Sequence, residues 1–132
     1  MTLIPTRVHA MIDYGVGLLV TVAPWLLGFA DHRVATTVTV SFGMAALLYS
    51  VLTDYELGLV RAIPVHAHLL VDVAWSLGLI VSPWLFGFAG RVAWPHVLIG
   101  LAGLTVTALT QRPPAPHHAF AKSAEQVRLQ QE

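Results

Sequence analysis

The side chains best suited to chemistry in this sequence form two histidine–aspartate pairs, His9 with Asp13 and His68 with Asp72. The spacing of four residues places both members of a pair on one face of a helix. An imidazole and a carboxylate side by side can pass a proton, and a histidine inside a helical bundle can ligate a haem iron. A carboxylate inside an apolar helix costs about 3 kcal/mol unless it is paired. We therefore expect both pairs to face the interior of a bundle.

These buried polar pairs allow three interpretations. The first, which we adopt, is a polar lock: each aspartate accepts a hydrogen bond from its own histidine, from the other pair's histidine, or from Tyr14, Ser76 or Trp75. The second is a cofactor site in which His9 and His68 approach the two faces of a haem b or ligate the magnesium of a chlorin pigment. The third is a proton or ion relay. The sequence contains no metal-binding spacing typical of zinc or di-iron sites, so no metal ion is predicted.

Both pairs belong to a longer internal repeat with an offset of 59 residues. Twelve of the 28 positions from 4 to 31 recur as identical residues at this offset. The clearest part is Ala-Pro-Trp-Leu-Leu-Gly-Phe-Ala at 23–30, which returns as Ser-Pro-Trp-Leu-Phe-Gly-Phe-Ala at 82–89. Apolar helices share Leu and Val by chance, but not Pro, His, Asp and Gly in register. The chain therefore consists of two copies of one structural unit.

The composition is that of a membrane protein. Apolar residues make up 56% of the 132 residues and charged residues 11%, where a soluble domain has about 25% charged residues. Residues 34–52 contain no Lys, Arg, Asp, Glu or His, and this is about the length that crosses a bilayer core. Residues 92–109 contain only His96, which we interpret as interfacial, and residues 5–22 and 64–81 are also apolar. The zero net charge argues against a nucleic-acid partner, and the lack of cysteine excludes disulfides and thiol chemistry.

The prolines predict where the helices begin and end. Pro5 and Pro64 suit the first turn of a helix, and Pro24 and Pro83 are expected to end the first and third helices. The predicted fold is therefore an all-α membrane protein with four transmembrane helices, arranged as two tandem helical hairpins. Each repeat crosses twice, so the hairpins should be related by a pseudo-twofold axis along the membrane normal. Residues 1–111 form the membrane domain, with repeats at 4–53 and 63–111, and residues 112–132 form a polar cytoplasmic tail.

The repeated turn motif is predicted to seat each hairpin at the membrane surface. Tryptophan prefers the membrane–water interface, proline breaks the helix there, and glycine lets the backbone turn back. An alternative is that the two turns together line a shallow site for a lipid, a quinone or a pigment. The residues of these interfacial turns are Pro24, Trp25, Gly28, Phe29, Pro83, Trp84, Gly87 and Phe88.

The two Pro-Trp-x-x-Gly-Phe runs resemble the signature of the SPW-repeat family of small integral membrane proteins. The second copy, Ser82-Pro83-Trp84, matches the signature in full, and the first has Ala23 in place of the serine. The resemblance covers residues 4 to 111 and implies a helical membrane domain with two helices per repeat. It implies no particular activity.

Charge and loop length complete the functional expectations. Five of the seven Lys and Arg residues fall on the side of the N-terminus, the middle loop and the tail, which predicts cytoplasmic termini in a bacterial inner membrane. No nucleophile–base set is apparent, so we expect no enzyme. The predicted role is a structural or accessory subunit that contacts lipid and either other membrane subunits or a second copy, with Phe120 and Val127 of the tail as a contact face. The alternatives are a haem- or pigment-binding electron-transfer protein using His9 and His68, and a proton-coupled small transporter using Asp13 and Asp72.

Overall fold

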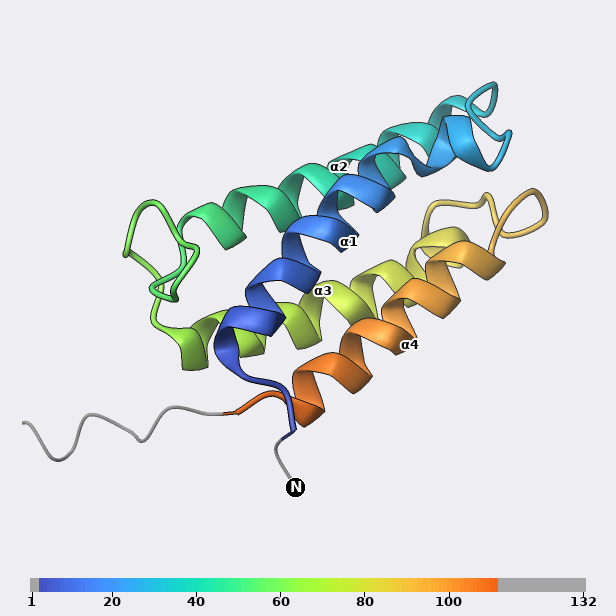
Figure 1. Cartoon of the computed structure of the whole chain (residues 1–132). Coiled ribbons are helices and arrows are strands. Elements are labelled where there is room, and N and C mark those ends of the chain that lie inside the picture. Colours follow the sequence, from blue (N-terminus) through green and yellow to red (C-terminus); the bar gives the residue numbers. More distant parts are fainter. Residues whose placement is uncertain (1–2, 112–132) are drawn as a thin grey trace, which may run out of the picture.

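The computed structural model describes residues 3–111, and the predicted tail with Phe120 and Val127 lies outside the described residues. Within this part the chain forms four helices: α1 (Thr6–Leu26), α2 (Arg33–Val51), α3 (Val65–Leu85) and α4 (Trp94–Leu109) (Figure 1). The first three are long and apolar enough to cross a membrane, and α4 is a shorter apolar helix of 16 residues. The all-helical prediction is confirmed.

Each half of the chain forms a helical hairpin. Helix α1 packs mainly against α2 and α3 mainly against α4, while α2 meets α3 more closely than α1 meets α4 (Figure 1). Glycines allow the close approach within each hairpin. A Cβ at Gly43 would meet the backbone of Thr21, and one at Gly100 would meet the carbonyl oxygen of Ser76. Small residues at these positions therefore let the helices of each hairpin pack closely.

The prediction that Pro24 and Pro83 end their helices is wrong. Helices α1 and α3 continue to Leu26 and Leu85, with each proline in the last turn. A proline there removes only one intrahelical hydrogen bond, from its own missing N–H to the carbonyl four residues earlier. For Pro83 that carbonyl belongs to Leu79, and the hydroxyl of Ser82 donates a hydrogen bond to it at 2.8 Å. The motif serine thus supplies the donor that the following proline lacks.

The helices end at the motif glycines instead. Gly28 and Gly87 have φ angles of +72° and +73°, the left-handed conformation that glycine adopts without strain. The Phe88 N–H donates to the Pro83 carbonyl at 2.8 Å, and the Gly87 N–H donates to the Trp84 carbonyl at 3.3 Å. These are the two bonds of a Schellman cap. The spacing Pro-Trp-x-x-Gly-Phe therefore encodes a helix stop.

The aromatic side chains of the two turns point in opposite directions. Phe29 and Phe88 are buried, whereas Trp25 and Trp84 are 62% and 61% exposed. Each turn therefore fixes the hairpin through its phenylalanine and presents its indole to the surroundings. This exposure is what an interfacial anchor requires.

His96 is buried rather than interfacial, so that prediction is wrong. Its Nε2 lies 2.8 Å from the Thr39 hydroxyl of α2, and its ring packs against Phe29 and Phe88, with centroids 6.1 and 5.1 Å away. The start of α4 at Trp94 directs the third residue of the helix between the two hairpins. No local sequence pattern indicates this burial, because the phenylalanines that cover His96 come from both turns.

The outward surfaces of the helices are apolar. Large hydrophobic side chains are exposed on every helix, as expected of a bundle surrounded by lipid. The residues with half or more of their surface exposed include Met11, Leu18, Met44, Leu48, Leu70, Leu77, Val81 and Leu98.

Candidate functional site

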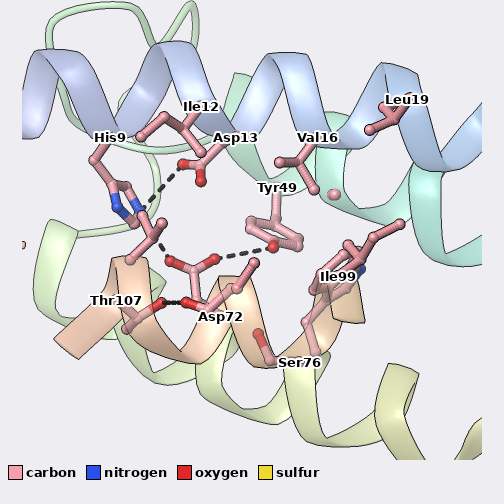
Figure 2. A pocket seen from close by; sticks show the side chains of 15 residues that line it. His9, Ile12, Asp13, Val16, Leu19, Tyr49, Asp72, Ser76, Ile99 and Thr107 are labelled. Atoms are coloured by element: carbon pink, nitrogen blue, oxygen red, sulfur yellow. Dashed lines mark hydrogen bonds and ion pairs between the residues drawn. The ribbon is translucent and has the colours of Figure 1, made fainter. Parts of the chain in front are cut away.

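The structure brings both predicted histidine–aspartate pairs into one cluster. His9 and His68 lie in the first turns of α1 and α3, and Asp13 and Asp72 follow one turn later on the same faces. His9, His68 and Asp72 are buried, and Asp13 is partly buried. The cluster lies near the end of the bundle that holds the middle loop (Figures 1 and 2). We call these four residues the His–Asp cluster.

The shortest contacts in the His–Asp cluster cross between the repeats. The Nε2 atom of His9 lies 2.9 Å from Oδ2 of Asp72, and Nε2 of His68 lies 3.0 Å from Oδ2 of Asp13. Within each repeat the corresponding distance is 3.3 Å. Two imidazole nitrogens and two carboxylate oxygens therefore alternate around a small ring. This ring links α1 to α3 and joins the hairpins.

Threonine hydroxyls orient both imidazoles. The Thr110 hydroxyl lies 2.8 Å from Nδ1 of His9 and 2.7 Å from the carbonyl of Val106. A carbonyl only accepts, so the hydroxyl donates its single hydrogen there and must accept one from Nδ1. Nδ1 of His9 therefore carries a hydrogen, and Nε2 faces the carboxylates.

The same arrangement holds in the other repeat. Thr53 lies 2.7 Å from Nδ1 of His68 and donates to the carbonyl of Tyr49 at 2.7 Å. Sequence reasoning missed both threonines. The signal was present, since Thr53 and Thr110 lie at equivalent positions just after α2 and α4, 57 residues apart.

Tyr49 is a further contact that the sequence did not indicate. Its hydroxyl donates to Oδ1 of Asp72 at 2.9 Å (Figure 2). The donors that we had considered are used elsewhere: Tyr14 donates to the carbonyl of Leu57 and Trp75 to the carbonyl of Phe42. Ser76, also considered, is 1% exposed and its hydroxyl has no partner within residues 3–111.

A cavity of about 220 Å³ adjoins the cluster. It is lined by residues from all four helices, and the polar groups in its wall include Asp13, Asp72, His9 and Ser76 (Figure 2). Most of the remaining wall is aliphatic. The cavity is therefore an apolar space with the His–Asp cluster at one end.

The cavity exists because the side chains at the α1–α4 interface are smaller than those at equivalent positions of the α2–α3 interface. Between α2 and α3, the space is occupied by Tyr49 and by Trp75, whose ring packs against Phe42 with centroids 5.9 Å apart. Each of these three aromatic residues has a smaller aliphatic counterpart in the other repeat. The counterparts of Tyr49, Trp75 and Phe42 all line the cavity, and they are Val106, Val16 and Ile99 respectively. The aromatic residues fill one side of the bundle, and their aliphatic counterparts leave the other side open.

The middle loop covers the cluster from outside the helices. Tyr55 in this loop is buried, and its ring centroid lies 5.3 Å from that of His68. Burial raises the pKa of the Tyr55 phenol above its usual value. A hydrogen bond of 2.8 Å from Thr6 at the start of α1 to Glu56 holds the loop in place. The loop therefore separates His68 from the aqueous side.

A second hollow lies beside the first motif turn. A hollow of about 270 Å³ at the outer end of α1 and α4 is lined only by apolar and aromatic side chains. It includes Leu26 and Leu27 of the first turn and Trp94 of α4, but no residue of the second turn.

The His–Asp cluster suits a small ion better than a haem. The two imidazole rings meet edge to face with centroids 5.5 Å apart, and both Nε2 atoms face carboxylates. A porphyrin between them would have to displace both aspartates. In contrast, one donor atom from each of the four residues lies within 4.8 Å of all the others, close enough to share one metal ion. Sequence spacing did not indicate this set because its members come from two helices 59 residues apart.

Comparison with known proteins identifies the family. Residues 7–110 match the SPW repeat domain, and the chain belongs to this family. No match was found among curated proteins or among solved structures.

Proposed function

We propose that this SPW-repeat membrane protein is an accessory subunit that packs in the bilayer against the helices of a larger membrane complex. The observation that carries the proposal is the distribution of polar and apolar groups. Helices α1 and α3 direct their two His–Asp pairs inward, where the pairs contact each other, and all four helices present large apolar side chains outward. The connections between helices are short, so little aqueous surface is available for other work. We assign the chain no catalytic step and no nucleic-acid partner.

We further propose how the bundle is placed. The two hairpins are related by a pseudo-twofold axis along the membrane normal, in the inner membrane of a bacterium, with both termini in the cytoplasm. The paired contacts His9–Thr110 and His68–Thr53 support the axis. The excess of Lys and Arg at the termini and in the middle loop supports the orientation. Trp25 and Trp84 then lie at the outer interface.

Purification at native abundance in mild detergent tests the accessory role. We expect the chain to co-purify with a larger membrane complex in fixed stoichiometry. A variant with Leu70→Asn and Leu77→Asn, both on the exposed face of α3, should fold but lose some of this association if that face is used. A matched pair on α1, Met11→Asn and Leu18→Asn, reports on the opposite hairpin. Recovery of the wild-type chain only as a monomer or as a self-associated species would overturn the accessory role.

Proton-coupled transport is the second candidate, and one observation favours it. The cavity reaches both buried carboxylates, so a small molecule there could exchange with a proton on Asp13 or Asp72. Proteoliposomes with a trapped pH dye test this, since a transporter acidifies or alkalinises the lumen when substrate is added. Asp13→Asn should abolish the change and Asp54→Asn, in the exposed middle loop, should not. The electron-transfer alternative is tested by the visible spectrum of the purified protein, in which we expect no haem or chlorin absorption.

A further inference from the structure

We propose that His9, Asp13, His68 and Asp72 bind one divalent metal ion of the zinc class, held between the first turns of α1 and α3. The site is independent of the accessory role, because it rests only on contacts within this chain. It uses one nitrogen or oxygen atom from each residue. The argument has three parts: the spacing of the donor atoms, the hydrogen on each imidazole, and the space beside the site.

The donor atoms have the spacing of a coordination shell. Consecutive Nε2 and Oδ2 atoms around the ring are 2.9, 3.3, 3.0 and 3.3 Å apart. Zinc binds histidine nitrogen and carboxylate oxygen at about 2.0–2.2 Å, which sets neighbouring tetrahedral ligands about 3.3–3.5 Å apart. The four distances around the ring are therefore within a few tenths of an ångström of those in a tetrahedral site, and the two distances across the ring, which are within 4.8 Å, shorten when the four atoms close on one ion.

The threonines prepare both imidazoles as ligands. Because Thr110 and Thr53 accept a hydrogen from Nδ1, a neutral His9 or His68 presents the lone pair of Nε2 toward the carboxylates. This is the outer-shell arrangement found around metal-binding histidines, where a hydrogen bond on the other ring nitrogen fixes the tautomer. It is satisfied twice, at equivalent positions in both repeats.

The charge balance of the ring accommodates one divalent cation at its centre. With both imidazoles neutral and both aspartates ionised, the four facing atoms have lone pairs only and carry two negative charges. Two lone-pair acceptors at 2.9 Å repel each other unless a hydrogen or a cation lies between them. One divalent ion supplies both missing charges at a single point. The same balance is reached with two extra hydrogens and no metal, and this is the competing state in the experiment below.

The donor chemistry selects the class of ion. Two imidazoles with two carboxylates suit zinc and its first-row neighbours, whereas magnesium and calcium prefer a shell of oxygens. The absence of cysteine removes the thiolates that favour copper(I). We therefore expect zinc, with cobalt(II) as a spectroscopic substitute.

The adjoining cavity provides a separate indication of a ligand. The Ser76 hydroxyl lines it, is 1% exposed and has no partner within residues 3–111. Ser76 lies one turn after Asp72 on α3, so its hydroxyl projects beside the site. At about 220 Å³ the cavity has room for several waters, each occupying about 30 Å³. A water on the bound ion would extend into this space and give Ser76 its missing partner.

The experiment measures metal binding to the full-length protein in detergent. Protein stripped with a chelator is incubated with zinc chloride and desalted, and zinc per chain is determined by elemental analysis. Cobalt(II) is added to a second sample to record the visible absorption of four-coordinate cobalt. The control is His66→Gln, which removes an exposed histidine two residues from His68. We expect one zinc per chain and the cobalt absorption in the wild type and in His66→Gln.

Two variants make the site falsifiable. Asp13→Asn combined with Asp72→Asn should lose the zinc and the cobalt absorption, and the zinc-dependent rise in melting temperature should vanish with them. Thr110→Val keeps all four ligands and should weaken zinc binding about 10- to 100-fold, with helix content unchanged. Absence of zinc from the wild type would overturn the proposal and leave the hydrogen-bonded state. Equal zinc in the wild type and the double variant, or an unchanged affinity in Thr110→Val, would also overturn it.

Discussion

Replacing Asp72 tests the role of the His–Asp cluster in stability. Asp72 contacts Nε2 of His9 on α1 at 2.9 Å and accepts a hydrogen bond from Tyr49 on α2, so it joins α3 to the other hairpin twice. Asp72→Leu leaves the Tyr49 hydroxyl without an acceptor, and His9 keeps only Asp13, at 3.3 Å. Each buried polar group that loses its partner costs about 1–3 kcal/mol, with membrane proteins at the lower end. We expect Asp72→Leu to lower the free energy of unfolding by about 2–4 kcal/mol.

Asp72→Asn should be milder because the amide can serve both neighbours. Its oxygen accepts from Tyr49, and its N–H₂ donates to Nε2 of His9, whose other nitrogen carries the hydrogen given to Thr110. We expect a loss of about 1 kcal/mol, the value of one altered hydrogen bond. The difference of about 1–3 kcal/mol between the two variants is the measurable quantity.

Denaturant unfolding in detergent, followed by circular dichroism with a chelator present, measures both values without a contribution from metal. Leu70→Ala is the matched control on α3, since its side chain is 71% exposed and should change stability by less than about 0.5 kcal/mol. Equal stability of the Asn and Leu variants would refute the reasoning, because it would mean that the polar contacts of Asp72 do not hold the hairpins together.

Three other predictions concern orientation and the turns. A single cysteine at Glu56→Cys should react with a membrane-impermeant maleimide only from the cytoplasmic side, and labelling of intact cells from outside would reverse the proposed topology. Ser82→Ala should lower the free energy of unfolding by about 1 kcal/mol, because it removes the donor to the Leu79 carbonyl. Ala23→Ser should raise the free energy of unfolding by up to about 1 kcal/mol. Changes of the opposite sign in denaturant unfolding would contradict the assigned role of the serine. Gly87→Ala should cost about 1–2 kcal/mol because its φ is +73°, and an unchanged unfolding midpoint would mean that the turn does not need glycine.

The sequence predicted the fold well because its signals were local or repeated. Apolar stretches separated by Arg, Asp and Pro gave four helices, and the repeat gave two similar units. Helix ends were less predictable. Pro24 and Pro83 indicated a break, but a proline in a last turn removes only one hydrogen bond, and the glycine four residues later ends the helix.

The sequence predicted which residues form the site but not how they contact one another. The pairs His9–Asp13 and His68–Asp72 stood out because charged groups are rare in apolar helices. That the shortest contacts cross between the repeats depends on the distance between α1 and α3, which no local pattern encodes. Tyr49 was missed for the same reason, since its contact with Asp72 depends on how α2 packs against α3.

The unequal filling of the two sides of the bundle has a consequence for what can pack against this chain. Two identical hairpins paired as a dimer would have two equal cavities or none. A single chain with duplicated halves is free of this constraint, so the α2–α3 side can carry Phe42, Tyr49 and Trp75 while the equivalent positions on the α1–α4 side carry small aliphatic residues. The bundle therefore has two unlike sides: the α2–α3 side, which aromatic residues fill, and the α1–α4 side, which borders the cavity. A neighbour that packed against the α1–α4 side would therefore lie next to the cavity that Asp13 and Asp72 line.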